Sequence, residues 1–126
     1  EIKAIVTDST YADFPEMIIQ YYGNFGPFKY LLGILPKLLG NLFLKGGLSR
    51  LSPENIIGSV MTPLLIIHSS NDPFVPVTHA RRLYEKANQP KELLILPGAT
   101  HGVGPGSEYQ ERITAFFKKY LVLKTS

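Results

Sequence analysis

The stretches TPLLIIHSSNDPFVP (residues 62–76) and ELLILPGATHG (residues 92–102) decide the fold of this chain. Each begins with a short apolar run and then turns polar. The Leu-Leu-Ile-Ile run of the first stretch has no polar alternation, which is typical of a parallel strand buried on both faces. We therefore predict two neighbouring parallel strands, with Asp72 and His101 just beyond their carboxyl ends, where open α/β sheets carry out their chemistry.

Apolar periodicity predicts that helices alternate with strands along the rest of the chain. Right-handed crossovers turn such an alternation into a parallel sheet. The predicted fold class is therefore α/β, a three-layer arrangement of a short parallel sheet with helices on both faces. Glycines and prolines break the helical pattern early in the chain, so we expect short helices joined by bends there. The expected strands are Ile2–Thr7, Leu64–Ser69 and Leu93–Leu96, and the expected helices are Pro15–Tyr22, Phe28–Leu35, Pro36–Leu44, Ser52 (as N-cap) to about Ile57, Val77–Asn88 and about Ser107–Leu121.

Two of these helices have a clear apolar face that predicts which side packs on the sheet. We expect His68, inside an apolar strand, to be a satisfied buried histidine, and His79, near a helix start, to be a surface residue. The inward-facing residues are predicted to be Ala80, Leu83, Tyr84 and Ala87 in one helix and Tyr109, Ile113, Phe116, Phe117 and Tyr120 in the other.

Composition limits the classes of function. The chain has 126 residues, a size at which one domain buries roughly two-thirds of its unfolded surface. Its 13 basic and 10 acidic residues are scattered, which does not fit a nucleic-acid partner. The absence of cysteine excludes disulfides, thiolate metal sites and cysteine nucleophiles. The three histidines lack zinc-ligand spacing, so we expect no metal and no cofactor.

The beginning of the chain and its most apolar segment bear on location. Glu1 is followed at once by a strand-like run, which suggests a segment of a longer protein, and no basic region precedes an apolar leader. The segment 28–44 is apolar but too short and too interrupted to form a transmembrane span. We expect a cytoplasmic protein without a transmembrane segment.

From Met61 to Leu121, the order of strand, acidic loop, helix, strand, His loop and aromatic helix resembles the last two βα units of the α/β-hydrolase family of serine hydrolases. IKAIVTDSTYADF (residues 2–14) resembles the strand that leads into the cap of that family. The resemblance implies that Asp72 is the triad acid and His101 the triad base. It also implies that residues 1–126 are the C-terminal part of an α/β-hydrolase domain, with about 15–58 as a helical, cap-like insertion.

The nucleophile of such a triad is not found in this sequence. A serine hydroxyl becomes nucleophilic when an imidazole, oriented by a carboxylate, takes its proton. Ser49 follows no strand and lacks the final glycine of the G-x-S-x-G elbow. Ser9 follows a strand, but no glycine accompanies it to permit a strained turn, so we expect it to cap a helix. The family usually has glycine at the position of Ser69, whose side chain is expected to narrow the approach to Asp72.

Two functional classes stay open. The favoured one is the C-terminal fragment of a serine hydrolase acting on an ester, amide or thioester, which supplies Asp72 and His101 and is inactive alone. The alternative is a non-catalytic, flavodoxin-like α/β binding module, in which both residues belong to ordinary polar loops. The expected partners are a small-molecule or acyl substrate and, through the free edge of the strand near Ile2–Val6, the missing N-terminal half or a second copy.

Overall fold

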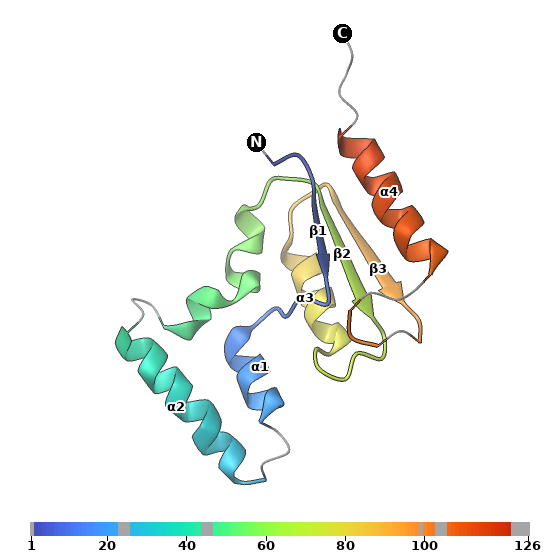
Figure 1. Ribbon diagram of the computed structural model, residues 1–126. Helices are drawn as coiled ribbons and strands as arrows, with labels where there is room; N and C mark the ends of the chain where they lie inside the picture. Colours follow the sequence, from blue (N-terminus) through green and yellow to red (C-terminus); the bar gives the residue numbers. More distant parts are fainter. Residues whose placement is uncertain (1, 23–25, 44–46, 99, 103–105, 122–126) are drawn as a thin grey trace.

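A three-stranded parallel sheet is the centre of the computed structural model, which describes residues 2–22, 26–43, 47–98, 100–102 and 106–121 (Figure 1). Strand β1 (Ile5–Asp8) pairs with β2 (Leu64–Ser69), and β2 pairs with β3 (Lys91–Leu96), in the order β1-β2-β3. The α/β class and the parallel sheet are confirmed. The strand β1 begins later than Ile2 and β3 begins earlier than Leu93, within the uncertainty of strand ends in sequence patterns.

The helices divide between the sheet and an arm that projects from it (Figure 1). Helices α3 and α4 flank the strands, while α1 and α2 pack on each other away from them. Short 3₁₀ turns lead from the arm back to β2. The bounds are α1 Phe14–Tyr21, α2 Phe28–Phe43, η2 Leu48–Leu51, η3 Pro53–Asn55, η4 Ile57–Ser59, α3 Val77–Lys86 and α4 Ser107–Leu121.

The core has two halves, one on each face of β2. Every residue of β2 is buried, as expected for a central parallel strand covered on both sides. Alternate side chains face opposite layers. One half contains Leu64 and Ile66 with residues of α3, and the other contains Leu65 and Ile67 with Phe116 of α4. The predicted inward faces of α3 and α4 are both found in these clusters.

Helix α2 corrects the prediction of two short helices joined by bends. It is continuous, with Pro36 inside it. The glycines serve contacts instead of bends: a Cβ at Gly33 would lie 2.8 Å from Cγ1 of Ile19, and one at Gly40 would lie 2.4 Å from Cγ of Leu48. Glycine at these two positions therefore lets α2 approach α1 and η2 more closely than any side chain would allow.

Ser52 has a different role from the predicted N-cap. The residues after it form 3₁₀ turns, and its side chain caps neither of them. Its Oγ instead accepts a hydrogen bond from the backbone N–H of Phe14 at 3.0 Å and donates to Oδ2 of Asp13 at 3.1 Å. Asp13 is the N-cap of α1 and accepts from the N–H of Glu16 at 2.7 Å. Ser52 therefore joins the start of the arm to its return segment.

His79 is buried, which contradicts the prediction that it lies at the surface. Its Nδ1 accepts a hydrogen bond from the backbone N–H of Ala12 at 3.0 Å, because the start of α3 packs under the segment that leads into α1. Burial lowers the pKa of His79; the charge of Glu16 acts in the opposite direction, and that of Arg82 lowers the pKa further. The sequence pattern could not predict this contact, because Ala12 and His79 are distant along the chain.

A cluster of ion pairs also fastens α3 to the arm. The guanidinium of Arg82 binds Glu16 of α1 and both carboxylate oxygens of Glu54, with Nε 3.1 Å from Oε2 and Nη2 2.8 Å from Oε1. Lys86 adds a contact of 3.1 Å to Glu54. These hydrogen bonds raise the pKa of Arg82, and they lower that of Glu54 against the opposing effect of burial.

Within the described part of the chain, no helix combines the length and hydropathy that crossing a membrane requires. Much of the apolar surface of α2 is exposed, including Leu38 and Leu42.

The double-sided burial of β2 predicts a large difference between two leucines. Leu65 is fully buried, so Leu65→Ala removes packing and leaves a cavity, and the free energy of unfolding should fall by about 2–5 kcal/mol. Leu42 is 74% exposed, and Leu42→Ala should change it by no more than about 0.5 kcal/mol. Urea denaturation followed by circular dichroism measures both. Equal losses in the two variants would contradict the assignment of the core.

Candidate active site

Asp72 and His101 meet at the carboxyl ends of β2 and β3. Nδ1 of His101 lies 2.8 Å from Oδ2 of Asp72, within hydrogen-bonding distance. The two loops reach each other because β2 and β3 are adjacent and parallel, so their carboxyl ends lie at the same edge of the sheet. The expected contact is therefore present in the structure. The catalytic roles of the two residues stay a prediction.

The two carboxylate oxygens of Asp72 have separate tasks. Oδ1 accepts hydrogen bonds from the backbone N–H groups of Phe74 at 2.8 Å and Val75 at 2.9 Å, which closes a turn of the kind that Asp favours. Oδ2 is left to bind His101. The interpretation of Asp72 as a turn residue and its interpretation as a partner of His101 are therefore both correct.

The environment of Asp72 favours the ionised form. Its side chain is fully buried, and burial alone would raise its pKa. The hydrogen bonds from Val75, His101 and Phe74 outweigh this effect and hold the pKa below its usual value. A carboxylate that stays ionised can stabilise a positive charge that develops on His101.

His101 has one ring nitrogen bound and the ring partly open to solvent. Its side chain is 43% exposed, and within the described residues no hydrogen bond to its Nε2 is found. With Asp72 accepting at Nδ1, the proton belongs on Nδ1 and Nε2 carries the lone pair. The ring of Phe74 packs edge-on against the imidazole, with centroids 5.3 Å apart. The sequence analysis did not identify Phe74 as a neighbour of His101, although its place in the turn after Asp72 was a signal for such a contact.

His68 supports the turn that holds Asp72. It is buried in β2, as predicted, and its Nε2 lies 2.7 Å from the carbonyl oxygen of Val75. A carbonyl oxygen can only accept a hydrogen bond, so Nε2 of His68 is the donor. This bond ties β2 to the turn that contains Asp72. The same nitrogen lies 3.6 Å from Oδ2 of Asp72. Its Nδ1 has no hydrogen-bond partner in the described part of the structure, so the histidine is satisfied at one nitrogen only.

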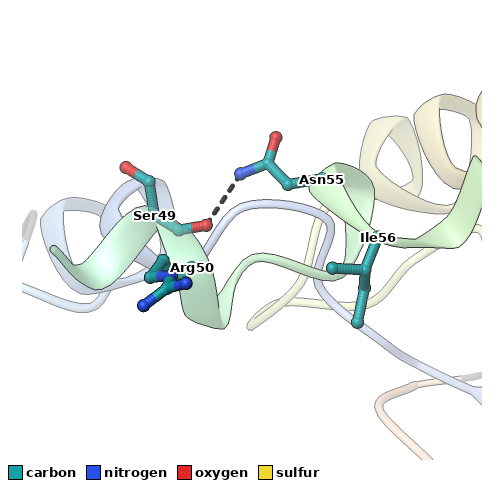
Figure 2. Close-up of a pocket in the computed structure, with 4 residues that line it drawn as sticks. All are labelled: Ser49, Arg50, Asn55 and Ile56. Carbon is teal, nitrogen blue, oxygen red and sulfur yellow. Dashed lines mark hydrogen bonds between the residues drawn. The ribbon is translucent and has the colours of Figure 1, made fainter. Parts of the chain in front are cut away.

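Ser49 lies away from these strand ends. It belongs to η2 and lines a pocket with Arg50, Asn55 and Ile56 (Figure 2). The carbonyl oxygen of Ser49 accepts a hydrogen bond of 2.7 Å from Nδ2 of Asn55. The pocket is therefore built by the segment that returns from the arm to the sheet, and nothing there resembles a nucleophile elbow.

Ser9 corrects two expectations. It has a positive φ of 51°, the left-handed conformation that its sequence context was expected to exclude without a glycine. It does not cap α1, since Asp13 does so. Its Oγ donates to Oδ1 of Asp8 at 3.0 Å and accepts from the N–H of Gly102 at 3.2 Å. Ser9 therefore contacts the loop of His101, although no hydrogen bond joins it to the imidazole.

Comparison with known proteins places these features in context. A profile of the family described as PhoPQ-activated pathogenicity-related protein matches residues 14–125. The uncharacterized protein YfhR of Escherichia coli K12 is 31% identical over 120 residues, which cover 91% of this chain and 36% of that protein. The human alpha/beta hydrolase domain-containing protein 17B is 34% identical over 67 residues, 52% of this chain and 23% of that protein.

Solved structures show the same fold. An esterase of Pyrococcus furiosus superposes with a TM-score of 0.65 at 25% identity, covering 95% of this chain and 46% of the esterase. The chain thus spans about a third of the length of YfhR and about half that of the esterase. The two comparisons cover 91% and 95% of this chain.

The ionised state of Asp72 predicts how stability depends on pH. A depressed carboxyl pKa stabilises the folded state above the unfolded pKa of about 3.9, and this contribution is lost as the pH falls through the folded pKa. At pH 7, Asp72→Asn should lower the free energy of unfolding by about 1–3 kcal/mol because it weakens hydrogen bonds to a charged group. The gap between wild type and variant should narrow toward pH 3. Urea denaturation at several pH values measures it, and a gap that stays constant with pH would contradict this assignment.

Proposed function

This chain belongs to the family of PhoPQ-activated pathogenicity-related proteins and has the α/β-hydrolase fold, and we propose that it carries the acid and the base of a serine hydrolase. Asp72 is the acid and His101 the base. The observation that carries the proposal is the contact of 2.8 Å between Oδ2 and Nδ1, which leaves Nε2 of a partly exposed imidazole for proton transfer.

The proposed chemistry is acyl transfer to a serine. Nε2 of His101 accepts the proton of the serine hydroxyl as its oxygen attacks the carbonyl carbon of an ester, amide or thioester. Asp72 stabilises the imidazolium that results. His101 then gives the proton to the leaving group as the bond to it breaks, and water repeats the sequence to release the acid.

The serine is proposed to come from outside this chain. The side chain of Ser9 is bonded to Asp8 and to Gly102, and Ser49 lies in η2, away from the strand ends. The donors that stabilise the oxyanion are proposed to come from the same source as the serine, because in this fold they neighbour the nucleophile. On this proposal the chain alone does not turn over substrate.

We propose that residues 15–58 act as a cap over the substrate. Three observations support this. The segment forms the arm of α1 and α2. Nε2 of Gln20 in α1 donates to the carbonyl oxygen of Phe74 at 3.4 Å, which brings the arm to the residue that packs against His101. The exposed apolar surface of α2 suits an acyl chain. The likeness to an esterase of the α/β-hydrolase fold is a reason to prefer this proposal to the flavodoxin-like binding module.

The activity test needs the full-length protein that contains this chain. With p-nitrophenyl acetate and p-nitrophenyl octanoate as substrates, His101→Ala and Asp72→Asn should each lower kcat by about a thousandfold or more, since loss of either triad member has this effect. Ser49→Ala is the matched control and should keep wild-type turnover. Folding is checked by circular dichroism. Turnover in His101→Ala within tenfold of wild type would refute the proposed role.

We also propose that this chain associates through the free edge of β1. Among the described residues, β1 pairs with β2 on one side only, and the backbone N–H groups of Ile5 and Ser9 point to that side. The alternation of a strand turns the N–H groups of Val6 and Asp8 toward the open edge. An unpaired edge of this kind adds a further strand, from a second copy or from the remainder of the protein.

Light scattering tests this association. The isolated chain should form dimers, and Ile2→Lys, which places a charge beside the edge at a residue that is 71% exposed, should shift it toward monomer. Leu42→Lys places the same charge on the exposed face of α2 and should leave the dimer intact. A monodisperse monomer of the wild-type chain, or dissociation by Leu42→Lys alone, would count against edge pairing.

A further inference from the structure

Serine hydroxyl groups hold the backbone on both sides of His101. On one side, Oγ of Ser69 donates a hydrogen bond of 2.6 Å to the carbonyl oxygen of Thr100. On the other, the N–H of Gly102 donates to Oγ of Ser9 at 3.2 Å. The two serines come from the ends of two different strands, so the His101 loop is fixed at two points by neighbouring parts of the sheet.

Ser69 is well placed to act as a rigid donor. It is the last residue of β2 and only 1% exposed, and its register partner in β3 is Leu96. Its side chain was expected to narrow the approach to Asp72, but it is directed instead to the carbonyl oxygen of Thr100. A glycine at this position, as is usual in the family that the sequence resembles, would offer no such bond.

Ser9 is held in one orientation by its own neighbours. Its N–H donates to the carbonyl oxygen of Ile67 in β2 at 3.1 Å, and its hydroxyl proton is directed to Oδ1 of Asp8. The other oxygen of Asp8, Oδ2, accepts from the hydroxyl of Tyr109 in α4 at 3.0 Å. Burial raises the pKa of Tyr109, and so does its bond to Asp8, which keeps the phenol protonated as a donor. The lone pair of Ser9 is therefore left for Gly102.

The backbone of Ser9 is strained, because its φ is positive, at 51°. The left-handed region is unfavourable for a residue other than glycine, so the positive φ of Ser9 persists only because surrounding contacts fix it. Such residues cluster at functional sites. The strain at Ser9 turns the chain at the end of β1 and leaves its hydroxyl in contact with the loop of His101.

At its start, the loop is also held by Ser70, whose Oγ accepts a hydrogen bond of 3.2 Å from the N–H of Gly98. Gly98 and Gly102, which lie on either side of His101, both have a positive φ, of 71° and 76°. The described residues of the loop have no regular secondary structure, and the imidazole is partly exposed. A general base works only when its nitrogen is held within about half an ångström of the productive position.

We propose that Ser9 and Ser69 are positioning residues that fix the backbone around His101, so that its imidazole keeps Nδ1 on Asp72 and presents Nε2 to the substrate. Neither serine touches the reacting atoms. The catalytic consequence rests on the proposed function, whereas the effect on the loop does not, and the two are tested separately.

The first test is nuclear magnetic resonance on this chain. Ser9→Ala, Ser9→Gly and Ser69→Ala are compared with Ser59→Ala, in which the lost hydroxyl bonds the distant carbonyl of Ile56. Both Ser9 variants should speed hydrogen exchange of the Gly102 amide about fivefold, the effect of one typical net hydrogen bond. All three variants should weaken or shift the low-field resonance of the His101 Nδ1 proton. Ser59→Ala should change neither.

The pair of Ser9 variants separates the hydroxyl from the backbone. Glycine accepts the positive φ freely, whereas alanine keeps the strain, and both lack Oγ. Equal effects of the two on Gly102 exchange support the proposal. If Ser9→Ala speeds exchange of the Gly102 amide and Ser9→Gly does not, the backbone conformation and not the hydroxyl is responsible. That result would overturn the assignment of Ser9. An unchanged Nδ1 resonance in folded Ser69→Ala would overturn the assignment of Ser69.

The second test uses the full-length protein with p-nitrophenyl esters. The Ser9 and Ser69 variants should lower kcat about tenfold with KM unchanged, because a displaced base slows chemistry without altering binding. If His101→Ala remains active, the proposed function fails while the resonance data stand. If His101→Ala is inactive and both serine variants keep wild-type kcat, the function stands and the positioning role is overturned.

Discussion

The burial of β2 on both faces is the constraint on which the rest of this structure depends. Its apolar side chains fill two separate core clusters, one under α3 and one under α4. A strand in this position must run parallel to its neighbours, because helical crossovers return the chain to the same starting edge. The loops after β1, β2 and β3 therefore all emerge at one edge. Ser9, Asp72 and His101 meet there for this reason.

Backbone groups, as well as side chains, hold Asp72 in place at the carboxyl edge of the sheet. Oδ1 of Asp72 accepts hydrogen bonds from the amides of its own turn, and Oδ2 contacts His101. His68, beneath the turn, binds the carbonyl oxygen of Val75. The carboxylate of Asp72 is therefore buried, and the hydrogen bonds of its own turn fix its orientation. Preorganisation of this kind is what proton transfer in a hydrolase requires, since reorienting a charge during the reaction would raise the barrier.

Where sequence reasoning was wrong, most of the contacts responsible join residues that are separated along the chain. His79 is buried because the segment before α1 covers it. Gly33 and Gly40 allow close packing of helices in place of bends. Ser9 adopts a positive φ without a neighbouring glycine because the loop of Gly102 and the carboxylate of Asp8 hold it. Periodicity and local propensity describe each element separately, so they carry no signal for such contacts.

The sequence by itself determined the α/β class, the bounds of β2 and α4 and the inward faces of α3 and α4, because burial on a regular element leaves a regular pattern of apolar residues. It also placed Asp72 and His101 at strand ends. Only the tertiary structure decided that their side chains lie 2.8 Å apart and that Ser9, just after β1, and Ser69, at the end of β2, form hydrogen bonds to the backbone on either side of His101. Those distances depend on loop paths, which no periodic pattern encodes.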